Sequence, residues 1–380
     1  MFQYRYLTSL DFSSLYDLKT IYLEPCRAIL PSSSTQIEET FTSTSGFDKK
    51  WMLRHHYALS NRSLSHNESP AVHLFHLKNC LLSDPFFDVI VNDSIVWESF
   101  HSSFAYKTWL FDSNFQSYKH IHASSTANVS EPGPFFLAPT RWYNTNYYHW
   151  TIDCLPKLLL FKELKSVITG LKLLIHRFPF DSFQSQWLRI LEIGDTEITY
   201  LREGVNHNIF DVYYVPILGA NFVSRLSSQY FKTGFDKYLQ KVNYSSSHYP
   251  EKIFISRRLG HVRSIANQTE INSLLAAYDF QVIYAEDFSV LDQLKLFTDA
   301  RYIIGIHGSG LSNLLFTSSS SSILEITPSC VNPAILDLAN SLELRYGYIV
   351  TPYSPIAKEN QLILVNPLTL QDQVNTLLSK

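Results

Sequence analysis

Residues 301–317 read RYIIGIHGSGLSNLLFT. The segment 302–306 is largely apolar, as expected for a parallel strand that is covered on both faces. Gly308 and Gly310 then allow the backbone to turn, and apolar residues resume at helical spacing over 311–316. Because a helix N terminus presents unpaired N–H groups and about half a positive charge, such a turn favours a phosphate group. The stretch predicts a strand, a glycine loop and a helix around an anion-binding site.

The loop departs from the dinucleotide-binding fingerprint in its last position. Its spacing is G-x-G-x-x-N, so Asn313 stands where the fingerprint has a third glycine for close helix packing. An ordinary strand-to-helix turn in an α/β core would have a similar pattern, and the loop alone leaves both interpretations open. His307 precedes the loop and would lie where the carboxyl ends of parallel strands form a ligand crevice. We therefore treat His307 and the loop, including Ser309, as one candidate site.

Length and composition limit the class of protein. A chain of 380 residues predicts two domains, and 45% hydrophobic with 17% charged residues indicates a globular protein. The net charge of −3 argues against a general nucleic-acid binder. No signal-peptide pattern and no membrane-length apolar run are present, so we expect a cytoplasmic protein without a membrane span. The scattered cysteines indicate neither a metal clip nor a disulfide framework: Cys26, Cys80, Cys154 and Cys330.

The order of expected elements predicts an α/β fold with two Rossmann-like domains facing each other across a cleft. Residues 1–132 have short strand-like pieces and loops, and 141–245 alternate between helix and strand. Both belong to an N-terminal domain that ends near residue 245. A second alternation over 251–352 predicts a doubly wound sheet, and a tail with a helix over 353–380 would pack back on the first domain. The second domain should contain strands 252–256, 281–284, 302–307, 323–326 and 347–351 and helices 270–278, 290–298, 311–316 and 333–342.

Two arginines follow the first strand of this second domain. Arg257 and Arg258 would lie at the carboxyl end of a buried strand, where a charged group is costly unless an anion meets it. A charged hydrogen bond to phosphate is worth about 1.5 to 3 kcal/mol, which favours a diphosphate clamp. The alternative is a solvated loop or an ion pair with Glu286 or Asp287.

A histidine and an aspartate share one face of the helix expected over 147–164. His149 and Asp153 are four residues apart, and Pro156 would kink the helix or end its first part. Such a pair resembles an acid/base pair aimed into a cleft. A histidine with a structural aspartate partner explains the same spacing.

Glu325 is a carboxylate within the apolar strand that follows the glycine loop. Buried glutamates are rare unless paired, and at a strand's carboxyl end this one could accept hydrogen bonds from ribose hydroxyls. A buried ion pair with an arginine is the alternative.

These motifs follow one another along about half of the chain, from residue 141 to 326. Their order is His149-Trp-x-x-Asp153-x-Leu-Pro156, then Ile255-Ser-Arg-Arg258, then Ile304-Gly-x-His-Gly-Ser-Gly-Leu-x-Asn-Leu-Leu-Phe316, then Leu324-Glu-Ile326. The ordered set resembles glycosyltransferase family 61. Two positions depart from the usual pattern, because Ser309 replaces a more common alanine and Ile306 stands where proline is frequent.

The resemblance implies a GT-B fold and an inverting transfer that uses neither a metal ion nor a cofactor. A nucleotide-sugar donor, with UDP as the expected nucleotide, would bind mainly to the C-terminal domain. A glycan or another hydroxyl acceptor would bind on the side of residues 1–245, and Asp153 or His149 would be the general base. The donor-binding residues would be Arg257, Arg258, His307, Gly308, Ser309, Gly310, Asn313 and Glu325.

The absence of other motifs agrees with a metal-free site. The sequence has no Asp-x-Asp pair, with which transferases of the other main fold hold a divalent metal, so arginines and backbone N–H groups would neutralise the diphosphate. No phosphate loop, H-E-x-x-H or G-x-S-x-G motif is present. Two other interpretations stay open, namely a nucleotide-binding GT-B-like module without catalysis and a phosphotransfer enzyme or sensor that does not discriminate sugars.

Overall fold

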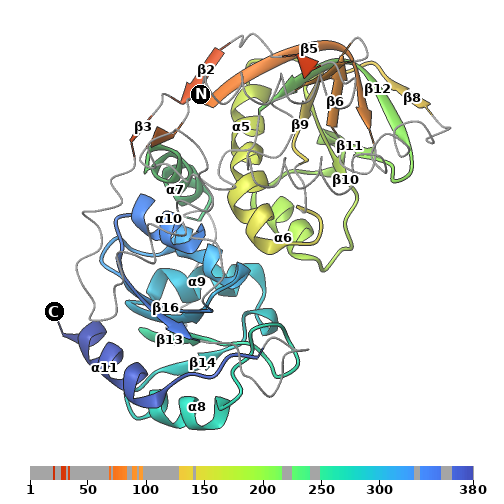
Figure 1. Ribbon diagram of the computed structural model, residues 1–380. Helices are drawn as coiled ribbons and strands as arrows, with labels where there is room; N and C mark the ends of the chain where they lie inside the picture. Colours follow the sequence, from red (N-terminus) through yellow and green to blue (C-terminus); the bar gives the residue numbers. More distant parts are fainter. Residues whose placement is uncertain are drawn as a thin grey trace. The chain divides into compact units, whose positions relative to one another are not determined.

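A computed structural model describes most of the chain after residue 127 and short segments before it (Figure 1). The chain divides into two compact units, and of the described residues those up to 215 belong to the first and those from 225 onward to the second. The described ranges are 20–21, 27–30, 33–34, 68–69, 72–83, 88–91, 94–96, 128–139, 143–215, 225–239, 249–328, 334–351 and 362–379.

The first unit is built on a mixed sheet. Its strands are β1 (Thr20–Ile21), β2 (Arg27–Leu30), β5 (Val72–Ser83), β6 (Asp88–Val91), β7 (Ser94–Val96), β8 (Asn128–Glu131), β9 (Phe135–Leu137), β10 (Lys172–His176), β11 (Ile198–Leu201) and β12 (Asn206–Tyr214). The order is β1-β7-β6-β5-β12-β9-β10-β11, with β2 beside β5 and β8 beside β12. β12 is parallel to β9 but antiparallel to β5. β10, β11 and β12, which come from the part predicted to alternate between helix and strand, pair in parallel with β9 or with one another. The sheet becomes mixed through the antiparallel β5–β12 pair, because β5 comes from the part predicted to have only short strand-like pieces. A separate small ladder joins β3 (Ser33–Ser34) to β4 (Glu68–Ser69).

One helical segment connects β9 to β10 in the first unit. It begins as the π-helix η2 (His149–Cys154) and continues as α5 (Leu155–Lys165). Pro156 lacks an N–H, and the wider π turn accommodates it, since the N–H of Leu155 donates to the carbonyl of Trp150 five residues earlier. The chain therefore stays helical through the position where a kink was predicted. The remaining helices here are α6 (Phe183–Ile190) and η3 (Asp195–Glu197).

The second unit contains a parallel sheet with one change of winding direction. Its strands are β13 (Lys252–Ile255), β14 (Gln281–Ile283), β15 (Tyr302–Ile306), β16 (Ser322–Pro328) and β17 (Arg345–Thr351). They lie in the order β14-β13-β15-β16-β17. The first strand therefore lies between the second and the third, which is the flavodoxin-like doubly wound order. The five strands predicted between residues 252 and 351 all lie in this parallel sheet, and their boundaries agree with the prediction within about two residues.

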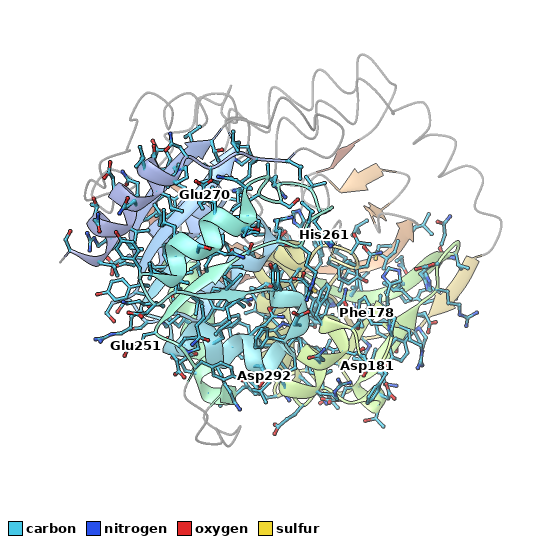
Figure 2. All side chains as sticks on the ribbon, turned by 90° about the horizontal axis from the view of Figure 1, so that it is seen from below. Phe178, Asp181, Glu251, His261, Glu270 and Asp292 are labelled. Atoms are coloured by element: carbon cyan, nitrogen blue, oxygen red, sulfur yellow. The ribbon has the colours of Figure 1, made fainter. Side chains whose placement is uncertain are left out.

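Helices cover both faces of this sheet (Figure 1). They are α7 (Arg225–Leu239), α8 (Gln268–Ala276), η4 (Ala285–Asp287), α9 (Val290–Asp299), the 3₁₀-helix η5 (Ser309–Phe316), α10 (Ala334–Ser341) and α11 (Pro367–Leu378). α8 and α11 pack together on one face, and α9 and α10 pack with η5 on the other. In Figure 2, Glu270 marks α8 and Asp292 marks α9.

Local signals explain where two of these helices begin. Ser289 precedes α9 and its hydroxyl accepts a hydrogen bond from the N–H of Asp292 at 3.1 Å. Asn366 caps α11 in the same way, and Pro367 follows at the first helical position, where its missing N–H has no cost. On the α8 and α11 face, alternate strand residues form a core with the two helices: Phe254, Ile304, Leu324, Ile326, Ile271, Leu275, Leu370, Val374 and Leu377.

Three elements differ from their predictions. α7 groups with the second unit and contacts η5 and α10, so the boundary follows Val223 rather than residue 245. α11 packs on β16, β17 and α8 of its own unit, and the prediction that it would pack on the first domain is wrong. The segment after the glycine loop is a tight 3₁₀-helix, and the hydroxyls of Ser312 and Thr317 bond carbonyls three residues back.

Candidate active site

The winding of the second sheet places its switch point between β13 and β15. The chain leaves β13 toward one edge through α8 and returns through α9 to form β15 on the other side of β13. In open α/β sheets, ligands bind outside the carboxyl ends of the strands at such a switch point. Arg257 follows β13 and His307 follows β15. The two motifs singled out in the sequence therefore meet at one place.

Arg257 lies directly against the glycine loop. A Cβ atom built on Gly308 would be 1.7 Å from Arg257 Nη2, so only glycine leaves room for the guanidinium group. Nη2 donates to the carbonyl of His307 at 3.3 Å, and Nη1 donates to that of Val262 at 3.0 Å. Burial and the charge of Arg263 lower the pKa of Arg257 to about 10, while Glu286 acts in the opposite direction. The group remains a cation at neutral pH and keeps N–H donors beyond these two contacts.

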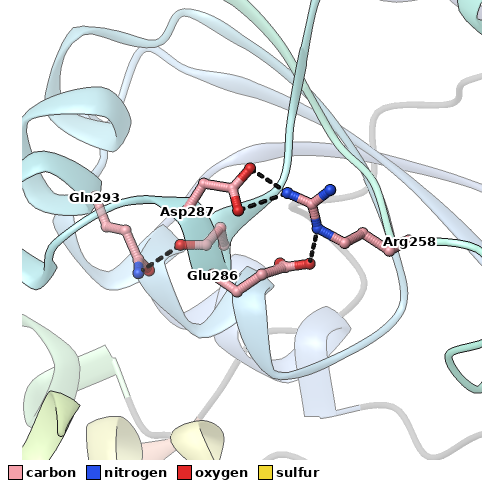
Figure 3. Close-up of polar contacts among 5 residues, drawn as sticks. Arg258, Glu286, Asp287 and Gln293 are labelled. Carbon is pink, nitrogen blue, oxygen red and sulfur yellow. Dashed lines mark hydrogen bonds and ion pairs between the residues drawn. The ribbon is translucent and has the colours of Figure 1, made fainter.

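Arg258 does not join Arg257 at the loop. Its Nη2 donates to both carboxylate oxygens of Asp287, at 2.6 and 2.5 Å, and its Nε lies 3.4 Å from Glu286 Oε1 (Figure 3). The guanidinium carbon also lies 4.6 Å from the centre of the Tyr284 ring. This is the ion pair that the sequence left as an alternative. Of the two arginines predicted to form the clamp, Arg257 lies against the glycine loop and Arg258 pairs with Asp287.

Asn313 has a structural partner inside the second unit. Its side-chain amide donates to Gln293 Oε1 at 2.8 Å, and Gln293 Nε2 in turn donates to the carbonyls of Ala285 and Phe288 at 2.9 and 3.1 Å. Figure 3 shows Gln293 beside the loop that carries Asp287. Asn313 is fully buried, so its place in the loop motif is explained by this link between η5 and η4. Ser309 and Gly310 are half-buried at the start of η5, where helical N–H groups have no partner within the helix.

His307, Glu325 and Tyr346 form a buried chain of hydrogen bonds. His307 Nδ1 lies 2.5 Å from Glu325 Oε1, and the hydroxyl of Tyr346 bonds to Oε2 of the same carboxylate. The side chains of His307 and Glu325 are 8% and 4% exposed. Glu325 pairs with a histidine rather than with an arginine, and both of its oxygens have protein partners. The sequence indicated Glu325 and His307 separately but gave no signal for Tyr346, which only the pairing of β16 with β17 brings close.

His149 and Asp153 make the hydrogen bond that their spacing predicted. His149 Nδ1 lies 2.7 Å from Asp153 Oδ2 within η2. The Asp153 side chain is wholly buried, whereas that of His149 is 14% exposed. A substrate could therefore reach the imidazole but not the carboxylate. This arrangement can hold the histidine in one orientation as a base.

Lys157 continues the face of the helix that carries His149 and Asp153. Its side chain is fully buried and its Nζ has no hydrogen-bond partner, with the ring centre of Tyr214 at 5.3 Å. Burial lowers the pKa of Lys157 to about 8, while Cys154 and Asp153 act in the opposite direction. Sequence reasoning missed this lysine, although a single cation within the run Leu155-Pro-Lys-Leu-Leu-Leu-Phe161 was a visible signal.

Aromatic rings pack around the start of η2. Tyr143 stacks on Trp150 with ring centres 6.2 Å apart, and Phe178 and Phe183 meet the Trp150 ring edge-on at 5.6 and 6.2 Å. Phe178 is labelled in Figure 2. Tyr143 and Trp150 are buried, so this cluster fixes the direction of η2 rather than offering an open stacking surface.

The described residues contain no grouping of three or more His, Cys, Asp or Glu side chains that is arranged to bind a metal ion. Among the helices of the same residues, none has the length and apolar character of a membrane span. The His149 pair belongs to the first unit and the Arg257 and His307 group to the second. That both contribute to one active site stays a prediction.

Fold and site together define an α/β chain with a buried arginine beside a glycine loop at the switch point of a doubly wound sheet. The family model described as Glycosyltransferase 61 matches residues 147–324, which run from the helix of His149 to the strand of Glu325. This match confirms the family predicted from the sequence, and the chain is a glycosyltransferase of family 61. No curated protein matches the chain.

Proposed function

We propose that the chain is an inverting glycosyltransferase that transfers a sugar from a nucleoside-diphosphate sugar, with UDP as the nucleotide, to a hydroxyl group of a glycan or another polymer. The proposal includes a GT-B arrangement, in which the two units face each other, and a reaction without a metal ion. The observation that carries it is the contact of Arg257 with Gly308 at the switch point of the second sheet.

The donor diphosphate would bind at this contact. Arg257 supplies a fixed positive charge, and the first N–H groups of η5 supply oriented dipoles. Both are in place before the reaction, so they stabilise the charge that grows on the leaving diphosphate without reorganisation. His307 lies at the same strand end and adds a ring nitrogen. These groups would neutralise the charge of the diphosphate, as a divalent metal does in other sugar transferases.

His149 is the better candidate for the general base than Asp153. Asp153 is wholly buried and already bonds to His149 Nδ1, whereas the imidazole of His149 is the more accessible of the two groups. The acceptor oxygen would attack the anomeric carbon from the face opposite the diphosphate. The bond from that carbon to the phosphate oxygen breaks, its electron pair stays on the diphosphate, and the proton of the acceptor moves to Nε2.

A thermal-shift screen with nucleotide sugars tests this proposal. A ligand that binds only the folded protein stabilises it by about 2.7 kcal/mol at a hundredfold excess over Kd. We expect a UDP-sugar to give the largest shift, both with and without EDTA. With an acceptor present, NMR of the product should show the inverted anomeric configuration. A shift or transfer that needs manganese or magnesium would contradict the metal-free mechanism, and a retained configuration would contradict inversion.

A further inference from the structure

Glu325 is a carboxylate inside the second sheet. It lies on the face of β16 opposite the core residues Leu324 and Ile326, and its side chain is 4% exposed. A buried carboxylate is costly unless hydrogen bonds compensate for lost water. Here one oxygen bonds to His307 and the other to the hydroxyl of Tyr346. The cost of burying the charge is therefore offset by two donors from neighbouring strands.

The bonding direction fixes the orientation of His307. An ionised carboxylate only accepts hydrogen bonds, so Nδ1 of His307 donates to Glu325. The backbone of His307 is held as well, since its N–H donates to the carbonyl of Ile326 at 2.8 Å and its carbonyl accepts from Arg257. Nε2 is then the ring nitrogen directed away from Glu325. The imidazole has little freedom to turn.

We propose that Tyr346 and Glu325 are positioning residues for the donor diphosphate and act through His307. This inference rests on the proposed function. When Nδ1 already donates to Glu325, a hydrogen bond from Nε2 to a diphosphate oxygen requires a proton on both ring nitrogens. The negative charge of Glu325 balances the resulting imidazolium, and Tyr346 holds the carboxylate in the required orientation. The chain thus extends from β17 through β16 to the end of β15.

The contacts favour this role for Glu325 over contact with the ribose. Both carboxylate oxygens already have protein partners, and the side chain is almost completely buried. A purely structural role would also explain the burial, but it makes a different prediction. Loss of a structural contact lowers the stability of the fold, whereas loss of a positioning contact lowers nucleotide affinity through His307.

Calorimetric titration with UDP separates these roles in a double-mutant cycle. Tyr346→Phe removes only the hydroxyl from a buried ring, and we expect it to weaken UDP binding by about 3- to 10-fold. His307→Asn retains an amide near the Nδ1 position and removes Nε2. In the His307→Asn background, Tyr346→Phe should cause no further loss of UDP affinity, because the residue through which it acts is already gone.

Tyr143→Phe is the matched control. Tyr143 is a buried tyrosine of the first unit whose hydroxyl bonds to His176, and loss of this hydroxyl should leave UDP affinity within about twofold of wild type. Glu325→Gln provides a second variant, which keeps the shape of the side chain but removes its charge, and it should weaken UDP binding at least as much as Tyr346→Phe.

Equal UDP affinity of wild type and Tyr346→Phe would overturn the inference. So would an equal loss of UDP affinity on Tyr346→Phe substitution in the wild-type and His307→Asn backgrounds. Failure of the wild type to bind UDP, GDP or ADP would instead reject the proposed donor site and, with it, this role.

Discussion

Arg257 occupies the space that a side chain at Gly308 would need. The nearest guanidinium nitrogen would lie 1.7 Å from a Cβ atom at residue 308. The Gly308 backbone itself is extended, with φ 162, a conformation that any residue adopts. The glycine is therefore required by the arginine rather than by the backbone.

Gly308→Ala should displace Arg257 and leave the fold intact. We expect UDP affinity to fall by roughly 10- to 100-fold, because a charged hydrogen bond is worth about 1.5 to 3 kcal/mol. Calorimetry measures the affinity and a thermal melt checks the fold. In an Arg257→Ala background the same substitution should have little further effect on UDP affinity. An additive loss would show that Gly308 contributes independently of Arg257.

Arg257 and Arg258 should differ in their importance for donor binding. Arg257→Ala removes the cation at the loop and should weaken UDP binding by roughly 10- to 100-fold. Arg258→Ala removes a half-exposed ion pair with Asp287, and such surface pairs contribute little to stability. We expect its UDP affinity to stay within about threefold of wild type. Equal losses for both variants would restore the two-arginine clamp.

Much of the second unit could be predicted from the sequence because its signals are local. Apolar strands separated by amphipathic helices give the parallel order, and the carboxyl ends of such strands share one rim, which brings Arg257 to Gly308. The match to the family extends the same reasoning, since it covers the motifs that carry these residues.

The rest depends on contacts between distant residues. Tyr346 reaches Glu325 only through the register of β16 and β17, and Arg258 turns away to Asp287, which lies on a different loop. The long antiparallel β5–β12 pair joins segments more than a hundred residues apart, so no local pattern indicated a mixed sheet. Proline rules predicted that Pro156 would kink the helix or end its first part, but they did not anticipate the π turn that precedes it.

Lys157 should reduce the stability of the native protein, and by less at high pH. Burial lowers the pKa of Lys157 to about 8 from the ordinary value of 10.5, so the unfolded chain binds more protons between these two pH values. The stability attributable to this group therefore rises with pH across that window. The full penalty below about pH 8 is roughly 3 kcal/mol, since one pKa unit corresponds to about 1.4 kcal/mol.

Lys157→Met removes this penalty while keeping the volume of the side chain. We expect the variant to be more stable than wild type, with a gain about 2 kcal/mol larger at about pH 7 than at about pH 9.5. Denaturant melts at both pH values provide the measurement. Lys162→Met, on the same helix but only half-buried, should change stability by about 0.5 kcal/mol or less at either pH. A gain that does not depend on pH would mean that Lys157 is not buried as a cation.

His149 and Asp153 should act as one unit in turnover. If Asp153 orients His149 as the base, Asp153→Asn keeps the packing but places an amide where the charged acceptor of the Nδ1 proton was. Turnover should fall by about 10² to 10⁴-fold, as for the loss of a general base, and His149→Ala should cause a similar fall. The double variant should have turnover no lower than that of the more damaged single variant, because the effects of residues that act as a unit are not additive.

The donor Kd of these variants should stay near that of wild type, since the groups proposed to bind the diphosphate are in the second unit. Glu163→Gln makes the same chemical change at an exposed position of α5 and should leave turnover unchanged. Near-normal turnover of Asp153→Asn, with its fold and donor affinity intact, would show that the aspartate is structural and that His149 does not depend on it.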